Sequence, residues 1–590
     1  MFGTNKQFSL ERLSFSTRGA FLSIYEDVND GQLYFTVCRG RLELLERPNL
    51  LRISTVYDGE EVPFIYECDE ARLLLKAKQG TVEFAFETAQ LLRVRAKGVT
   101  LKVSYASSMH DGGHVRENGE VEIGFTYIGK LLFAPVSGSM TNNADWNFRK
   151  VCPTSFDILL TPAEGEAAEM AVYEYYSNGR AQTEYPAFDD VVQARYAEFA
   201  EFRSKYPPVP EVYEEMAKKA VYLIWTLLME HRGYLKSPIV YMHKLFMNRA
   251  FGWHQGFHAI AMRNDPVTAW NLCFSMFDYQ NEHGALPDHV SDQLEDVWVS
   301  TKPPIYGYAV CRMLDEFDLS GLTREDYASA YDKLSRFTNW WFTHHDRAGT
   351  GYPAYYHADE SGYDESTAFN AGLPIHSPDL LSYMVFSCEA CARLADILGE
   401  PEAAEKWNAQ AKKVLDYLVN ELWDGEQFLS KLTTDGRLYK CGAVVQLQPI
   451  MLGRRLPQEI IDKLTGRLMD PEEFLTDYGT STENLKSDKL VVKAFTRGAV
   501  VAPTQMLLIF GMFDAGKTAE ARALATRYLN ALMHRGLALG IHSYRVEPVG
   551  FGRIPEDHRP LAVGFPFTPW VGSIFLALAE KLRETEPNAY

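Results

Sequence analysis

The 590-residue sequence has no cluster of basic residues, and its net charge is −19. Such a charge repels a phosphate backbone, and no run of lysine and arginine with interleaved aromatic residues offsets it locally. The sequence also lacks an uninterrupted apolar stretch of the ~18–20 residues that a membrane helix needs. Its start shows no basic region leading into an apolar run and a cleavage site. We therefore expect a cytoplasmic protein with neither a nucleic-acid nor a membrane partner.

Cysteine is sparse, and the eight cysteines follow no regular spacing. A disulfide framework or a zinc site would show such spacing, whereas scattered thiols suit a reducing compartment. The one close pair, Cys388 and Cys391, lies in a stretch of helical periodicity with no second pair nearby. We expect this pair to fill space in a core.

Residues 1–190 are rich in short β-like runs separated by Asp, Gly, Asn and Pro, a pattern typical of an antiparallel β-sandwich. Eleven such runs are enough for two stacked sheets. They cover residues 20–26, 33–40, 50–57, 62–68, 71–78, 81–88, 91–98, 99–106, 122–129, 156–162 and 170–177.

Residues 191–212 are expected to form a linker, because a helical segment there runs into Pro207, Pro208 and Pro210, which cannot continue a helix. From 213 to 590 the apolar residues recur at helical spacing in about twelve segments. Twelve helices in antiparallel pairs fit a double-ring (α/α)6 toroid or a superhelix, and periodicity alone does not separate the two. No fixed-period repeat is present.

The connections between these helices favour the toroid, because they are dense in Trp, Tyr, His, Asp and Pro where ordinary loops carry Ser, Gly and Lys. Binding groups concentrate on loops held by a rigid scaffold, and exposed aromatic residues need a reason. Aromatic faces and carboxyl groups are what cleavage of a glycosidic bond requires, since one carboxylic acid protonates the leaving oxygen and a second carboxylate activates water or attacks the sugar. This composition indicates a carbohydrate substrate.

Several ordered motifs make the pattern more specific. Between 249 and 313 they are a Trp-x-x-x-Phe start, an Asp-Pro helix opening, a Gln-rich turn ending in Gly-x-x-Pro, and a Pro-Pro pair: Trp253 to Phe257, Asp265-Pro266, Gln280 with Gly284 to Pro287, and Pro303-Pro304. Further on come the stretches 360–369, 478–487, 496–505, 544–552 and 565–578. In this order the motifs resemble the catalytic domain of glycoside hydrolase family 63, with its α-glucosidases and mannosylglycerate hydrolases. The resemblance covers about residues 240–590, and the preceding sandwich fits the family's architecture.

The resemblance implies an exo-acting, inverting α-glycosidase, α-glucosidase-like, that acts on small glycosides or oligosaccharides without a cofactor. Asp364, in the stretch that matches the family's Ser-Gly-x-Asp-Asn-Ser segment, takes the place of the general acid. The other residues expected at the substrate are Trp253, His254, Gln255, Asp288, Asp359, Glu483, Arg497, His542, Tyr544 and Trp570.

Two positions depart from the family. His254 stands where family members usually have an Asp that holds a sugar hydroxyl. The general base is expected in the stretch 540–550, where His542, Tyr544 or Glu547 could occupy its position. We assign the base to Glu547, the only carboxylate of the three. An imidazole at His542 could also accept a proton from water, because its ordinary pKa is ~6.5.

Other readings of these residues stay open. Asp364 could cap the next helix, Asp288 and Asp359 could have structural roles, and Glu483 could pair with Arg497. His254 and His258 lack the intervening Glu of a zinc protease, so we expect no metal. The rival functions are a uronic-acid lyase or epimerase on the same toroid, and a carbohydrate-binding protein that has lost catalysis.

Overall fold

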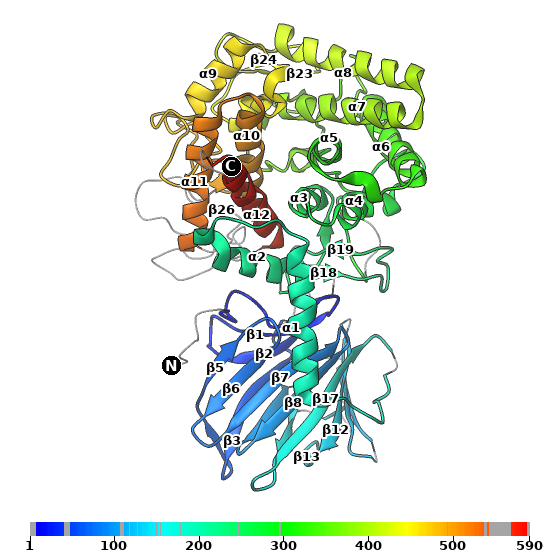
Figure 1. Ribbon diagram of the computed structural model, residues 1–590, viewed down its shortest axis with the longest axis vertical. Coiled ribbons are helices and arrows are strands. Elements are labelled where there is room, and N and C mark those ends of the chain that lie inside the picture. Colours follow the sequence, from blue (N-terminus) through cyan, green and yellow to red (C-terminus); the bar gives the residue numbers. More distant parts are fainter. Residues whose placement is uncertain are drawn as a thin grey trace.

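The computed structural model describes residues 8–586, apart from 40–47, 107–110, 117, 127, 148–151, 154, 178, 246, 294–296, 492–493, 536–539 and 542–567. Two parts are stacked along the long axis of the molecule, a β-sandwich and a ring of helices (Figure 1). The predicted fold class, an antiparallel β-sandwich followed by a helical toroid, is confirmed. No helix in the described part of the chain is both long and apolar enough to cross a membrane.

The sandwich consists of two antiparallel sheets. The first has the order β1-β2-β3-β9-β16-β13 with β4 on β3, and the second has the order β10-β11-β12-β17-β8-β7-β6-β5. The strands are β1 Leu22–Glu26, β2 Leu33–Val37, β3 Leu51–Tyr57, β4 Glu60–Val62, β5 Phe64–Cys68, β6 Leu73–Ala77, β7 Thr81–Thr88, β8 Leu91–Lys97, β9 Thr100–Ala106, β10 Gly112–Val115, β11 Val121–Phe125, β12 Gly129–Ser137, β13 Ser139–Asn142, β16 Ser155–Thr161 and β17 Ala167–Tyr175. A two-stranded ribbon, β14 Trp146–Asn147 and β15 Cys152–Pro153, is separate.

Apolar side chains from alternate strand positions fill the space between the two sheets. In β9, Leu101, Val103 and Tyr105 are buried, and the residues between them are partly exposed. This alternation is expected of a strand with one face in the core. Phe35 of the first sheet meets Phe84 and Phe133 of the second, edge to face. One predicted strand was too long: of residues 122–129, the first four belong to β11, and β12 begins at Gly129.

The expected linker is mostly helix. α1 (Phe188–Ser204) runs along the sandwich and packs on β7 through Phe188, Val191 and Val192 (Figure 1). The helix ends where the prolines begin, and η2 (Glu211–Tyr213) leads into α2. The break at Pro207 therefore follows from the missing N–H groups.

The toroid is an inner ring inside an outer one. The inner elements pack in a closed circle: α3 (His254–Ala261) on α5 (Tyr306–Glu316), then α7 (Pro378–Leu398), η8 (Gln448–Arg455), α10 (Ala502–Asp514) and α12 (Pro569–Glu584), which returns to α3. The outer helices are α2 (Glu214–Leu227), α4 (Pro266–Phe274), α6 (Arg324–His344), α8 (Pro401–Glu421), α9 (Gln458–Leu468) and α11 (Thr518–Arg535). Because α12 packs back on α3, the described elements form a closed ring and not an open superhelix. One inner position, η8, is a 3-10 helix.

The inner elements all begin at the same end of the ring, because each is reached by a loop from an outer helix. Four short sheets tie these loops together: β18 (Leu228–Met229) with β19 (Ile239–Val240), β20 (Ala250–Phe251) with β21 (His289–Val290), β22 (Ile375–His376) with β23 (Ser430–Leu432) and β24 (Leu438–Tyr439), and β25 (Val500–Val501) with β26 (Gly540–Ile541). The remaining 3-10 turns are η3 (Ser275–Tyr279), η4 (Leu319–Gly321), η5 (Ala358–Ser361), η6 (Thr367–Phe369) and η7 (Val444–Gln446). The predicted site residues that the structure describes lie on these loops or in the first turns that follow them.

The cysteine pair of α7 and the tryptophan pair of α6 both pack against the core. Cys388 and Cys391 are buried as free thiols inside α7, so they fill the core as expected. Of the adjacent pair Trp340 and Trp341, Trp341 is fully buried while Trp340 lies partly exposed against the core.

Candidate active site

Asp364 lies on the loop between η5 and η6 that leads towards α7. Two residues earlier, Gly362 takes a φ of 70° as the cap of η5. A β-carbon at Gly362 would lie 2.6 Å from Cζ2 of Trp253, so the backbone of this loop rests directly on the indole. Glycine is needed here both for the left-handed conformation and for the close approach.

The residue before Asp364 anchors the loop in the middle of the ring. The Tyr363 hydroxyl donates to Oε1 of Gln448 at 2.6 Å and lies 2.7 Å from the Thr504 hydroxyl. Gln448 in turn donates to the Tyr383 hydroxyl at 3.3 Å. These partners come from η8, α10 and α7, so Tyr363 ties three inner elements to the position of Asp364.

Three charged groups act electrostatically on the Asp364 carboxyl. Lys302 binds the Asp288 carboxylate at 2.9 Å and donates to the backbone oxygen of Asp359 at 3.2 Å. The second oxygen of Asp288 lies 2.6 Å from Nδ1 of His289. The charges of Lys302, Asp359 and Asp288 all act on Asp364. The structure therefore brings together Asp288, Asp359 and Asp364, which lie on separate loops in the sequence.

The pKa of Asp364 is raised above the usual range of an aspartate. Desolvation by the surrounding protein is the largest cause, Lys302 opposes it, and Asp359 and Asp288 add to it. The side chain is nevertheless exposed. Water thus reaches this carboxyl on one side while protein crowds it on the other, which suits an acid that must hold a proton and deliver it to a bound molecule.

An aromatic wall stands next to this loop. His254 stacks on Trp570 with ring centroids 4.0 Å apart, and Trp253 meets Trp570 at 4.9 Å. Trp253 and Trp570 are only 5% and 3% exposed, so most of each ring lies against protein. Burial, His258 and Lys302 hold the pKa of His254 well below its ordinary value. His254 is therefore a neutral imidazole that can both donate and accept a hydrogen bond.

Glu483 and Arg497 brace the Asp364 loop from its other side. The buried Glu483 carboxylate accepts hydrogen bonds from Thr367 at 2.7 Å and Ser487 at 2.6 Å, and burial raises its pKa. Arg497 donates to the backbone oxygen of Glu365 at 3.1 Å. Both residues hold the loop on which Asp364 lies, and Arg497 also acts on the charge of Glu483.

The Gln255 side chain binds the protein backbone. Its fully buried amide accepts from the backbone N–H of Val240 at 3.2 Å and donates to the Val240 carbonyl at 3.0 Å. His258 is buried as well, with Nδ1 2.8 Å from the Ser573 hydroxyl. Within the described ranges, no group of three or more His, Cys, Asp or Glu side chains could hold a metal ion.

His542, Tyr544 and Glu547 lie outside the described residues. The chain enters their segment from β26, whose partner β25 directly precedes α10, and leaves it at Thr568, just before Trp570. Both ends of the segment therefore adjoin loops that lead into inner helices.

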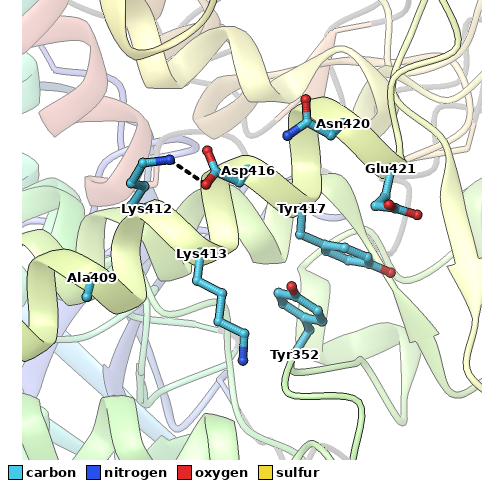
Figure 2. A pocket seen from close by; sticks show the side chains of 8 residues that line it. All are labelled: Tyr352, Ala409, Lys412, Lys413, Asp416, Tyr417, Asn420 and Glu421. Atoms are coloured by element: carbon cyan, nitrogen blue, oxygen red, sulfur yellow. Dashed lines mark hydrogen bonds and ion pairs between the residues drawn. The ribbon is translucent and has the colours of Figure 1, made fainter.

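A separate hollow of about 650 Å³ lies along the outer helix α8 (Figure 2). Tyr352 stacks on Tyr417 in it with centroids 3.9 Å apart, and Lys412 pairs with Asp416 at 2.5 Å. Because an outer helix forms it, this hollow lies apart from Asp364 and the loops before the inner helices.

Comparison with known proteins decides the family. Residues 248–545, half of the chain, match the model described as the mannosylglycerate hydrolase MGH1-like glycoside hydrolase domain. The chain belongs to this family. It is therefore a glycoside hydrolase that acts on carbohydrate. No curated protein sequence matches the chain.

Solved structures share the fold of this MGH1-like hydrolase. The GH63 mannosylglycerate hydrolase from Thermus thermophilus, in complex with glucose, is 18% identical over 62% of this chain and 100% of its own, with a TM-score of 0.51. A bacterial glucoamylase complexed with acarbose is 10% identical over 98% of this chain and 95% of its own, with a TM-score of 0.63. The GH92 family glycosyl hydrolase ccman5 is 12% identical over 98% and 86%, with a TM-score of 0.57. The last two cover the sandwich as well as the toroid.

Sequence reasoning missed Lys302, Tyr363 and His289 at this site. Lys302 directly precedes the Pro-Pro pair that opens α5, and Tyr363 directly precedes Asp364. Their position next to recognised motif residues was the available signal. Nothing in the sequence tells that Lys302 reaches Asp288, fourteen residues away.

Proposed function

We propose that this hydrolase is an exo-acting, inverting α-glycosidase of small glycosides, in which Asp364 is the general acid. One observation supports this most strongly: Asp364 is open to solvent and yet has a raised pKa, among the charges of Lys302, Asp288 and Asp359. A raised pKa lets a carboxylic acid hold its proton to a higher pH than an ordinary aspartate does, and such an acid can donate it to a glycosidic oxygen.

In this mechanism the Asp364 proton passes to the glycosidic oxygen while the bond from that oxygen to the anomeric carbon breaks. A water molecule attacks the anomeric carbon from the opposite face, and Glu547 accepts its proton. The sugar leaves with inverted configuration and the aglycone leaves as an alcohol. His254, a neutral imidazole beside Lys302, is the proposed contact for a sugar hydroxyl.

The test is a panel of α-glucosides and α-mannosides, with the product anomer followed by NMR from the first turnovers. Mannosylglycerate belongs in the panel, because the Thermus thermophilus relative is a mannosylglycerate hydrolase. Inversion predicts that an α-linked substrate first releases the β-anomer. Release of the α-anomer would contradict inversion, and binding without turnover would favour the carbohydrate-binding alternative. The lyase alternative is tested by a uronic-acid glycoside, from which a lyase would release an unsaturated uronate.

The base is tested by single variants Glu547→Gln, His542→Gln and Tyr544→Phe. Loss of the base removes activation of water, so azide, a nucleophile that needs no base, should restore turnover only in the variant that lacks it. Rescue of Glu547→Gln alone is the expected outcome. Rescue of His542→Gln would transfer the role to the imidazole.

A further inference from the structure

A buried group of charged and tyrosine side chains joins the β-sandwich to the loop after β21. The Asp292 carboxylate, completely shielded from solvent, accepts hydrogen bonds from the hydroxyls of Tyr176 at 2.6 Å and Tyr241 at 2.9 Å. Arg39 lies 3.4 Å from the same carboxylate. Arg39 and Tyr176 belong to the sandwich, whereas Tyr241 and Asp292 belong to the toroid, so this carboxylate is held from both parts.

The carboxylates of this group are paired with arginines. Arg39 also pairs with Glu174, and Arg232 binds the other oxygen of Glu174 at 2.5 Å. The Arg39 guanidinium lies over the Tyr176 ring, 3.4 Å from its centroid. Two arginines thus face two carboxylates in a region where an unpaired charge would be costly. Such an arrangement tolerates only a small displacement of any member.

The backbone on either side of the Asp292 side chain is fixed as well. Its carbonyl accepts from the Tyr234 N–H at 3.0 Å, and its N–H donates to the Tyr241 hydroxyl at 2.7 Å. A β-carbon at Gly233 would lie 2.2 Å from the Asp292 carbonyl oxygen, which leaves no room for a side chain there. The next residue, Gln293, donates to the Ile128 carbonyl of the sandwich at 3.2 Å.

Asp292 lies four residues after Asp288 of the candidate active site. Asp288 donates its N–H to the Val297 carbonyl at 2.8 Å and accepts at its own carbonyl from Gly252 at 3.0 Å. Its side chain holds Lys302, whose charge acts on Asp364. A shift of the Asp292 segment would therefore move Asp288 and Lys302 relative to Asp364.

We propose that Asp292, held by Arg39 and Tyr176 of the β-sandwich, is a positioning residue that fixes the Asp288–Lys302 ion pair beside Asp364. Through these contacts the sandwich helps to position the residues around Asp364. The effect on turnover rests on the proposed function, whereas the placement of the loop does not.

The test variant is Tyr176→Phe, which removes one hydrogen bond to Asp292 and keeps the ring under Arg39. The matched control is Tyr173→Phe on β17, whose hydroxyl lies 2.7 Å from that of Tyr185 and accepts from the Gln182 N–H. Hydrogen–deuterium exchange of peptides covering 286–302 should be about fivefold faster in Tyr176→Phe, the opening expected from one lost hydrogen bond. It should be unchanged in Tyr173→Phe. Asp292→Asn, a second variant, should give the same pattern.

Activity gives the second measurement. Tyr176→Phe should lower kcat more than it changes KM, and it should displace the basic limb of the pH profile, because the charges around Asp364 move. A role in stability alone would lower only the folded fraction and leave the profile unchanged.

The outcomes separate the two proposals. Unchanged exchange at 286–302 in Tyr176→Phe and Asp292→Asn, or equal acceleration in Tyr173→Phe, would overturn the positioning role. Acceleration specific to the first two variants in a protein that cleaves no glycoside would support the positioning role while refuting the proposed hydrolysis.

Discussion

Gly362 lies against the indole of Trp253 so closely that an added β-carbon would be 2.6 Å from Cζ2 and 2.7 Å from Cη2. The contact joins the loop of Asp364 to the loop that opens α3. Because Asp364 follows two residues later, the glycine sets how far its carboxyl stands from the aromatic wall.

Replacing Gly362 with Ala should therefore affect both stability and activity. The φ of 70° costs an alanine about 1 kcal/mol, and the clash adds roughly 1–3 kcal/mol of overpacking. Gly399→Ala is the control, since its φ of 77° imposes the same backbone cost with nothing within 4 Å of the new methyl group. The measurements are the free energy of unfolding in denaturant and kcat/KM, each for both variants. Both quantities should fall further in Gly362→Ala than in Gly399→Ala. Equal losses would mean that the contact with Trp253 is unimportant.

Removal of the acid should abolish most of the turnover. Asp364→Asn should reduce kcat by about 10²–10⁴-fold, the usual contribution of a general acid. The loss should be smallest for substrates with activated leaving groups, which need no proton. Glu365→Gln, one residue on, is the control and should retain wild-type turnover. An Asp364→Asn enzyme with more than a tenth of the wild-type kcat on unactivated substrates would refute the assignment.

Two charge changes near Asp364 should move the pH profile in opposite directions. Lys302 lowers the pKa of Asp364, so Lys302→Gln should raise it and extend activity to higher pH. Asp359 raises the pKa of Asp364, so Asp359→Asn should lower it and draw the basic limb to lower pH. The basic limb of kcat/KM against pH measures both. Shifts of the same sign would show that charge does not control this limb.

The buried carboxyl of Asp379, which begins α7, should make stability depend on pH. Burial raises the pKa of Asp379 to about 6, although Ser377 and Tyr355 donate hydrogen bonds to it. The folded state therefore binds its proton more tightly than the unfolded state does. This contribution is complete below the unfolded pKa of ~3.9 and is lost as the pH rises through about 6.

The measurement compares wild type with Asp379→Asn, whose side chain does not titrate. Between pH 4 and 7 the wild-type free energy of unfolding should fall by roughly 3 kcal/mol relative to the variant, as the shift to about 6 implies. A difference that stays constant over this range would contradict the prediction.

The fold followed from periodicity more readily than the site did. Strands with clean alternation, such as β9, and amphipathic helices such as α8 were evident because one face of each is buried. Closure of the ring was not evident. It depends on contacts between α12 and α3, which are some 300 residues apart, and no local pattern encodes it. Likewise, η8 carries a helix-like pattern, but Gly453, with φ 57° and ψ −132°, interrupts the helical backbone.

At the site, the order of motifs was enough to propose Asp364 as the acid, whereas the orientation of its neighbours could not be predicted from residue type. Gln255 has the chemistry of a sugar ligand, but its amide binds the backbone of Val240. Trp253 and Trp570, which were expected to contact the sugar, also pack on each other. Which way a side chain points depends on its backbone position and its neighbours, and neither is visible in a motif.

The apolar core runs without interruption from Phe8 and Phe15 beneath the sheets, through Tyr222 and Trp225 of α2, to Leu582 at the end of α12. A fragment cut at the prolines after α1 would leave one side of this core facing water in both pieces. The sandwich and the toroid should consequently melt in a single cooperative transition, and neither is expected to persist as an independently folding module.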